Sequence, residues 1–344
     1  MLSFEEFQDY CKEHLVGALP DGYENATVTV NEVIKNNGRV LTALTVMPEG
    51  QNVAPNIYLD GFYMEYETGT DLDTIMDEMA DLCMSHIHPS QDISNIGQQF
   101  RDVNFVRDRI IMVAVNREKN AELLSDCPHT NREDLALIYK VLVSSEDAGT
   151  ATITIHNDHL AFWDMTVEEV HELAMKNTRE LLPITVQSMN EVMREMFSRD
   201  GMDEEMLEAL FEDRPADEQM FVISNESKVN GAASIFYEDV LTDLAAKMGT
   251  DLYVLPSSIH ECIAVSCKLN TPDALAEMVS EINEGQVAKE EQLSDHVYYF
   301  NAQEKTLTLA DTSTMELGLS AAENREFYET AQTNTEGSRP RHHR

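Results

Sequence analysis

The side chains best suited to chemistry lie in one short run, Pro256 to Glu261. This run places the hydroxyls of Ser257 and Ser258 near the imidazole of His260 and the carboxylate of Glu261. A serine, a histidine and a carboxylate carry out acyl transfer when they converge in space. In an extended segment, however, Ser258 and His260 point to one side and Glu261 points to the other. A hydrolase site here would therefore need a further partner from a distant part of the chain.

The same run also has a structural interpretation, which the sequence favours. Serine hydroxyls in loops commonly hydrogen-bond to backbone amides, and a histidine such as His260 can cap the end of a helix or strand. The chain also lacks the G-x-S-x-G elbow that presents the nucleophile of many serine hydrolases. We therefore keep Ser257, Ser258, His260 and Glu261 as candidate catalytic residues of the less favoured interpretation.

The candidates for metal ligands are His156, Asp158 and His159, because two imidazoles and a carboxylate suit a first-row transition metal. No H-E-x-x-H motif accompanies them, and histidines without such a pattern are more often surface or capping groups. The glycine motifs G-x-x-x-x-G-K-S/T and G-x-G-x-x-G do not occur either. The sequence therefore predicts no metal site and no cofactor.

Acidic residues dominate the charge of the chain. The 63 Asp and Glu residues outnumber the 24 Lys and Arg residues and give a formal net charge of -39. Nucleic-acid backbones and anionic membranes attract clustered cations, so we expect neither direct nucleic-acid binding nor membrane binding. The charge instead favours encounter with a basic protein partner.

The sequence also predicts a cytoplasmic protein. Its longest strongly apolar run, Ile110 to Val115, is far shorter than the about 20 residues that span a bilayer. The first residues, Met1 to Glu6, lack the basic and apolar regions of a secretory signal. The five cysteines are scattered and form no C-x-x-C pair, which indicates free thiols.

Local signals predict an N-terminal α+β domain over residues 1–182. Ser3 and Glu6 form a capping box that opens a first helix. The turn Asn36-Asn37-Gly38 joins two strand-like stretches into an antiparallel hairpin. The remaining elements expected here are helices over 71–88 and 166–182 and strands over 109–116, 134–143 and 150–156.

Residues 183–218 predict an acidic, methionine-rich helical connector. From position 164 to 218 the chain has 16 acidic and 5 basic residues. Apolar side chains recur at helical spacing, and such stripes usually pack against a core. Methionine faces also serve as adaptable binding surfaces, which makes the methionines candidate interaction residues. These methionines are Met189, Met193, Met196, Met202 and Met206.

Residues 219–310 show strands and helices in more regular alternation, which predicts a smaller C-terminal α/β-like domain. Few apolar residues remain after that, and we expect a disordered tail over 325–344. The fold class predicted for the whole chain is α+β.

Six segments together resemble a known family. The resemblance covers roughly residues 1–310, and its most specific part is the last of these segments. It is to an uncharacterised bacterial family, a domain of unknown function found mainly in anaerobic gut bacteria and often on mobile genetic elements. It implies no activity, ligand or cofactor. The segments are Lys35–Gly38, Asn56–Tyr63, Asn120–His129, Asp134–Tyr139, Gly231–Ala233 and Leu255–Glu261.

Two hypotheses about function follow from the sequence. The favoured one is a non-enzymatic interaction or regulatory protein whose acidic surface engages a basic protein, with mimicry of DNA as one form of this role. The alternative is a hydrolase with its site around Ser258, His260 and Glu261. Whether the protein is an enzyme stays open at this point.

Overall fold

The computed structural model describes residues 1–49, 54, 56–87, 96–146, 149–199, 201–203, 206–207, 210–211, 214–268 and 271–310. The tail predicted to be disordered, residues 325–344, lies outside the described residues. None of the described helices is both long enough and apolar enough to cross a membrane.

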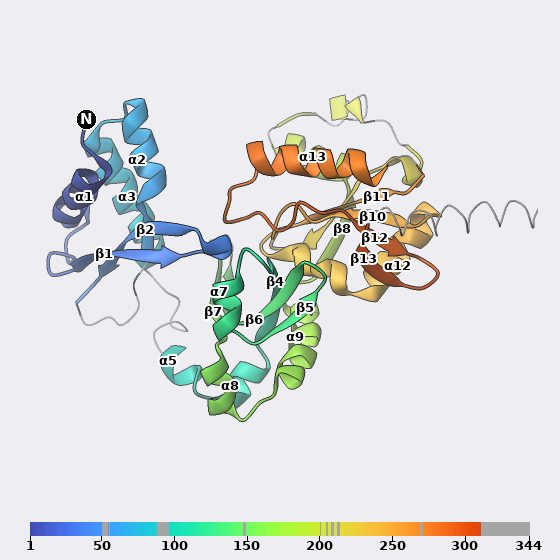
Figure 1. The fold of residues 1–344 in the computed structure, drawn as a ribbon. Helices are drawn as coiled ribbons and strands as arrows, with labels where there is room; N and C mark the ends of the chain where they lie inside the picture. Colours follow the sequence, from blue (N-terminus) through green and yellow to red (C-terminus); the bar gives the residue numbers. More distant parts are fainter. Residues whose placement is uncertain are drawn as a thin grey trace, which may run out of the picture.

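The N-terminal part folds around its own core, on the left of Figure 1. Three antiparallel strands form sheet A in the order β1-β2-β3, and the apolar stripes of the helices pack against it, with Phe7, Leu44 and Met79 fully buried. The predicted hairpin and helices are confirmed. The elements are α1 (Phe4–Ala18), β1 (Thr27–Ile34), β2 (Val40–Met47), β3 (Asn56–Tyr58), α2 (Leu59–Thr68) and α3 (Leu72–Ile87).

The turn of the β1–β2 hairpin is a short 3-10 segment, η1 (Asn36–Gly38). Asn37 has φ 61° and Gly38 has φ 65°, both in the left-handed region. Asparagine and glycine tolerate this region better than other residues, which explains why this pair occupies the turn. The hairpin thereby directs its end toward the next part of the molecule (Figure 1).

The middle of the chain forms sheet B, in which β6 is the central strand. β4 pairs with one side of β6, while β5 and β7 pair with successive parts of its other side, all antiparallel. The predicted helix over 166–182 is confirmed as α9, with its capping box from Thr166 to Glu169. The elements are α5 (Ile96–Gln99), α6 (Val103–Arg107), β4 (Ile110–Asn116), α7 (Ala121–Asp126), β5 (His129–Arg132), β6 (Leu135–Glu146), β7 (Gly149–Thr154), α8 (Asn157–Trp163) and α9 (Val167–Leu181).

The C-terminal part forms sheet C, six antiparallel strands in the order β13-β12-β10-β11-β9-β8. The sheet lies between α13 on one face and α12 on the other (Figure 1). Its elements are β8 (Ile184–Ser188), α10 (Met189–Arg199), η2 (Ala216–Glu218), β9 (Phe221–Asn225), η3 (Gly231–Phe236), α12 (Glu238–Met248), β10 (Leu252–Leu255), β11 (Cys262–Ser266), α13 (Pro272–Gly285), β12 (Tyr298–Asn301) and β13 (Thr306–Leu309).

The α+β class is confirmed, and two features differ from the detailed predictions. The strand–helix alternation of 219–310 predicts an α/β-like unit, but every strand pair in sheet C is antiparallel. The predicted connector also contributes a strand, β8, to that sheet. The physical reason is that long-range pairing, which local periodicity does not encode, decides strand direction and membership.

One large buried cluster joins sheets B and C. It contains Met112 and Tyr139 from sheet B together with Phe221, Val254 and Tyr298 from sheet C. The sequence predicts separate domains with boundaries at 182 and 219, and this division stays a prediction. Within the structure, residues from both sides of these boundaries share this core.

Candidate functional site

The loop between β10 and β11 carries the predicted catalytic residues, and backbone contacts hold it in place. Ser258 is buried, and its hydroxyl accepts a hydrogen bond from His260 N at 3.0 Å. Ser257 O accepts from Leu293 N at 2.9 Å, and Ser258 bridges to Gln292. The local bond within the Ser258–His260 turn is the kind predicted for a structural role.

The His260 ring contacts groups other than the serines. Its Nδ1 accepts from Asn230 N at 3.3 Å, and its Nε2 lies 3.5 Å from the carboxylate of Glu291. Burial raises the pKa of Glu261, and the nearby charge of Glu291 adds to this effect. The structure thus brings Ser258, His260 and Glu261 close together without a serine–imidazole hydrogen bond in the described chain. The hydrolase alternative stays a prediction.

Gly231 fixes this loop against β9. A Cβ at this position would lie 2.6 Å from His260 O and 2.8 Å from Asn225 N, and it would also overlap the hydroxyl of Ser224. That hydroxyl donates to His260 O at 2.8 Å. Only glycine fits between these atoms, so the loop has little freedom to move.

The histidines considered as candidate metal ligands, His156 and His159, have other partners. His156 Nδ1 lies 2.7 Å from Asp126 Oδ2, and His159 Nδ1 accepts from His156 N at 3.0 Å. Asp158 is exposed at the start of α8. In the part of the chain that the structure describes, no group of three His, Cys, Asp or Glu side chains could hold a metal ion.

Cys127 Sγ lies 3.8 Å from His156 Nδ1, the same ring nitrogen that contacts Asp126, so the imidazole does not link the thiol to the carboxylate through its two nitrogens. Burial raises the pKa of Cys127 to about 11, and the charge of Asp126 adds to the rise. The thiol is therefore protonated near neutral pH and lacks the thiolate that nucleophilic catalysis needs.

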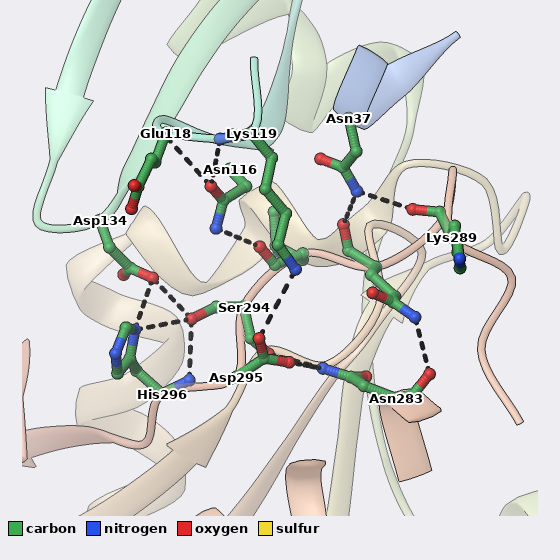
Figure 2. A network of polar contacts seen from close by, with 12 residues as sticks. Asn37, Asn116, Glu118, Lys119, Asp134, Asn283, Lys289, Ser294, Asp295 and His296 are labelled. Atoms are coloured by element: carbon green, nitrogen blue, oxygen red, sulfur yellow. Dashed lines mark hydrogen bonds and ion pairs between the residues drawn. The ribbon is translucent and has the colours of Figure 1, made fainter. Parts of the chain in front are cut away.

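Sequence reasoning missed a polar junction that links three distant segments. The junction consists of Asn36, Asn37, Asn116, Asn120 and Asn283 together with the loop 287–296. Figure 2 shows Asn37, Asn116 and Asn283 of this junction converging between the end of the β1–β2 hairpin and that loop. The one sequence signal at this junction is the asparagine–glycine pair of the hairpin turn. It predicts the turn but not the distant residues that the turn contacts.

The asparagine side chains of the junction mostly bond to backbone carbonyls. Asn37 Nδ2 donates to Lys289 O at 2.8 Å and to Gln292 O at 2.7 Å. Asn116 Nδ2 donates to Leu293 O at 3.0 Å. Because each segment alone leaves these carbonyls without partners, the bonds fix the loop and the hairpin relative to each other.

Asp134 is the acceptor at one end of this junction (Figure 2). Its Oδ2 accepts from Ser294 Oγ at 2.6 Å and from His296 Nδ1 at 3.0 Å, and its Oδ1 accepts from Tyr298. Burial alone would raise the pKa of Asp134, but these three hydrogen bonds outweigh burial and lower it.

The Asp134–His296 pair has the geometry of an oriented general base, because the carboxylate holds Nδ1 and the ring is largely exposed. Ser294, however, is fully buried and donates to Asp134, so it cannot serve as a nucleophile for this histidine. The contacts of this cluster therefore indicate a role in positioning and stabilising the loop 287–296 and not a role in catalysis.

A cleft of about 370 Å³ lies between the β5–β6 turn, α12 and the β12–β13 hairpin. Apolar and polar side chains both line it, and Lys305 is paired with Glu238 at 2.9 Å. None of the candidate catalytic or metal-ligating residues named in the sequence analysis lines this cleft. The lining residues are Asn131, Arg132, Glu133, Ile235, Phe236, Glu238, Leu241, Phe300, Lys305 and Leu307.

The predicted interaction methionines occupy α10 and the segment after it. Among the helices of ten or more residues that the structure describes, α10 is the one with no buried residue, although its apolar residues recur at helical spacing. Met189, Met193 and Met202 are half-buried, whereas Met196 is 53% exposed and Met206 is 59% exposed. An apolar helix face left this open is uncommon in a soluble protein.

Further exposed apolar side chains lie beside these methionines in the chain. We define the β8–α10 surface as Val186, Met196, Met206, Leu210 and Met220, which are all exposed. The elements are in contact, because α10 packs on β8 and β9 and Met189 N donates to Met220 O at 2.8 Å. The segment after α10 folds back onto it through the stacked rings of Phe197 and Phe211.

Comparison with known proteins gives one match. A family described as a family of unknown function (DUF5688) matches residues 4–302. No curated protein and no solved structure matches the chain.

Proposed function

The chain belongs to this family of unknown function, DUF5688, and from that premise we propose that it is an interaction protein that binds a basic protein partner. The binding site is the β8–α10 surface. The observation that carries the proposal is that α10 buries none of its residues and exposes Met196, within a stretch in which acidic residues outnumber basic ones.

The apolar part of the surface supplies contact area. Exposed apolar patches rimmed by polar residues are typical of protein interaction sites. Methionine side chains adapt their shape to a partner because they are unbranched and polarizable. The exposed Met196 and Met206 are therefore suited to contact a partner, and Val186, Leu210 and Met220 add exposed apolar area.

The acidic part of the surface selects the partner. Residues 189–218 contain 11 acidic and 3 basic residues. One of the three bases, Arg194, donates from its guanidinium to Phe211 O within the same segment. The excess negative charge raises the association rate with a basic partner and disfavours acidic ones.

A pull-down from lysate of the source cells tests this proposal with matched variants. The double variant Met196→Glu/Met206→Glu adds charge to the β8–α10 surface, while Met278→Glu makes the same change at an exposed methionine of α13. We expect the wild type and Met278→Glu to retain the same basic protein, and the double variant to lose it.

Salt provides a second arm of the same experiment. At 1 M salt the Debye length falls to about 3 Å, so the charge-driven part of the binding should be lost while the fold is retained. Equal capture by the double variant and by Met278→Glu would contradict the proposal. Capture of proteins without excess basic residues would contradict the charge selection.

A further inference from the structure

The hydrogen-bond register of β8 shows which side of the strand is open. β8 is the last strand of sheet C in the described chain. Just outside its ends, Met189 N donates to Met220 O at 2.8 Å and Glu226 N donates to Pro183 O at 2.9 Å. Positions 183 and 189 are therefore hydrogen-bonded to β9. In an antiparallel pair, hydrogen-bonded and non-hydrogen-bonded positions alternate, so positions 185 and 187 also bond to β9.

The backbone N–H and C=O groups at the even-numbered positions of β8 point away from β9. Ile184 and Val186 direct their N–H and C=O groups to this free side, and no hydrogen bond from the described residues reaches these groups. Ser188 differs because its N–H donates to the carboxylate of Glu191 at 2.6 Å, at the start of α10. The open edge thus comprises the outward backbone groups of two alternate residues, Ile184 and Val186.

The edge lacks the usual protection against further strands. Natural sheet edges commonly carry lysine, proline or a bulge that prevents strand addition. β8 has the sequence ITVQS, with no such residue and no register shift in its pairing with β9. Isoleucine, threonine and valine favour extended backbone. The side chain of Val186 is 37% exposed at the middle of this edge.

We propose that the basic partner binds by adding one extended strand to the open edge of β8. This inference rests on the proposed function and specifies its binding mode. Backbone hydrogen bonds to Ile184 and Val186 would supply registration, as in other strand-addition complexes. Alternate apolar side chains of the added strand would contact Val186 of the β8–α10 surface.

Charge determines the composition of the added strand. α10 begins directly after β8 and carries Glu191 and Glu195. Glu195 Oε1 accepts from Gln187 of β8 at 2.6 Å, which places its carboxylate next to the strand, while its other oxygen lies 4.0 Å from Lys228 Nζ in an exposed ion pair. A strand with lysine or arginine at every second position would set these cations near the acidic residues and its apolar residues near Val186.

A defined peptide tests the binding mode without an identified partner. The probe is fluorescein-labelled KVKVKVK, and the comparator KPKVKPK has the same charge but two prolines that interrupt strand hydrogen bonding. Fluorescence anisotropy at 0.15 M salt should show binding of the first peptide at least about tenfold tighter than that of the second. Equal affinities would mean charge attraction alone and would overturn the proposal.

Two variants of Val186 separate the backbone from the side chain. Val186→Pro removes an outward N–H that the sheet does not use, whereas Val186→Thr keeps that N–H and the preference for extended backbone. We expect the proline variant to bind KVKVKVK about fivefold more weakly and the threonine variant to bind it like the wild type. Circular dichroism verifies that both variants fold.

Hydrogen exchange of the unmutated protein keeps the test valid if Val186→Pro fails to fold. Saturating KVKVKVK should slow exchange at the amides of Ile184 and Val186. Slowing at Leu307 of β13 instead would place the strand on the opposite edge of sheet C and overturn the proposal.

The double variant Met196→Glu/Met206→Glu distinguishes the two proposals. Suppose this variant captures less of the native partner, and KVKVKVK does not slow hydrogen exchange at Ile184 and Val186 of the unmutated protein. This combination would retain the proposed function and reject strand addition. Unchanged capture by it would reject the proposed function itself.

Discussion

Asn37 and Asn120 exchange two hydrogen bonds across the junction between sheets A and B. Asn37 N donates to Asn120 Oδ1 at 2.9 Å, and Asn120 Nδ2 donates to Asn37 Oδ1 at 2.9 Å. Asn120 Nδ2 also donates to Asn116 O at 2.9 Å, which anchors it to the end of β4. These contacts attach the separately packed N-terminal part to the remainder of the molecule.

Replacing Asn37 by aspartate should open this junction. The change substitutes a carboxylate oxygen for the N–H₂ that donates to Lys289 O and Gln292 O, so an acceptor would face two acceptors. We expect Asn37→Asp to lower the free energy of unfolding by about 1–3 kcal/mol. Hydrogen exchange should become faster in the loop 287–296.

Asn25→Asp is the control for that variant, because it makes the same chemical change at an exposed position, where Asn25 Nδ2 donates to Glu49 Oε2 at 3.1 Å and solvent can replace that bond. Chemical denaturation should give nearly wild-type stability for it. If Asn37→Asp also leaves both stability and exchange unchanged, the junction does not attach the two parts in solution.

Gly231→Ala should destabilise the protein because the new Cβ has no space. It would contact His260 O, Asn225 N and the hydroxyl of Ser224, and two of these three atoms are backbone atoms that cannot move independently. We expect a loss of about 1–3 kcal/mol, as for other overpacked sites. Thermal and urea unfolding measure it.

Gly17→Ala is the matched substitution in open space. No atom lies within 4 Å of its Cβ, and it is located in the last turn of α1. Alanine is a better helix former by up to about 1 kcal/mol, so this variant should be equally or more stable. Equal effects of the two variants would show that the loop 256–261 yields to accommodate the Cβ at position 231.

Asp134→Asn should reveal a pH-dependent contribution to stability. The amide cannot accept from Ser294, His296 and Tyr298 together, so the variant should lose about 1–3 kcal/mol at pH 7. The pKa of Asp134 is lower in the folded protein than its usual value. Its contribution is therefore complete above the unfolded pKa of about 3.9 and is lost as the pH falls through the folded value.

Urea unfolding between pH 7 and pH 3 measures this difference. The difference in free energy of unfolding between the wild type and Asp134→Asn should become smaller as the pH approaches 3. Asp9→Asn, an exposed position in the middle of α1, should follow the wild type throughout. A gap that stays constant with pH would show that the charge of Asp134 is not responsible.

The sequence predicts elements whose signals are local. The capping boxes at Ser3 and Thr166 each join residues three positions apart, and both helices begin where predicted. The hairpin turn at Asn36–Gly38 likewise depends on adjacent residues with left-handed backbone. For such elements, a short stretch of chain contains the information that determines the structure.

The missed features depend on distant residues. β8 lies in a stretch whose methionine spacing predicts helix, and its strand forms because β9, more than 30 positions away, offers a partner. Asn37 and Asn120 are 83 positions apart. The loop 256–261 shows the limit for sites: the sequence identifies the residue types, but the contacts of the His260 ring come from Asn230 and Glu291. Those contacts have no local signal.

Site-specific photo-crosslinking tests the central claim most directly. A benzophenone amino acid replaces Met196 in one variant and Met278, exposed on α13, in the other. Irradiation in source-cell extract at low salt should join the variant at position 196 to one basic protein, with no such product from position 278. Crosslinking of that protein equally from both positions, or only of acidic proteins from position 196, would contradict the proposed interaction surface.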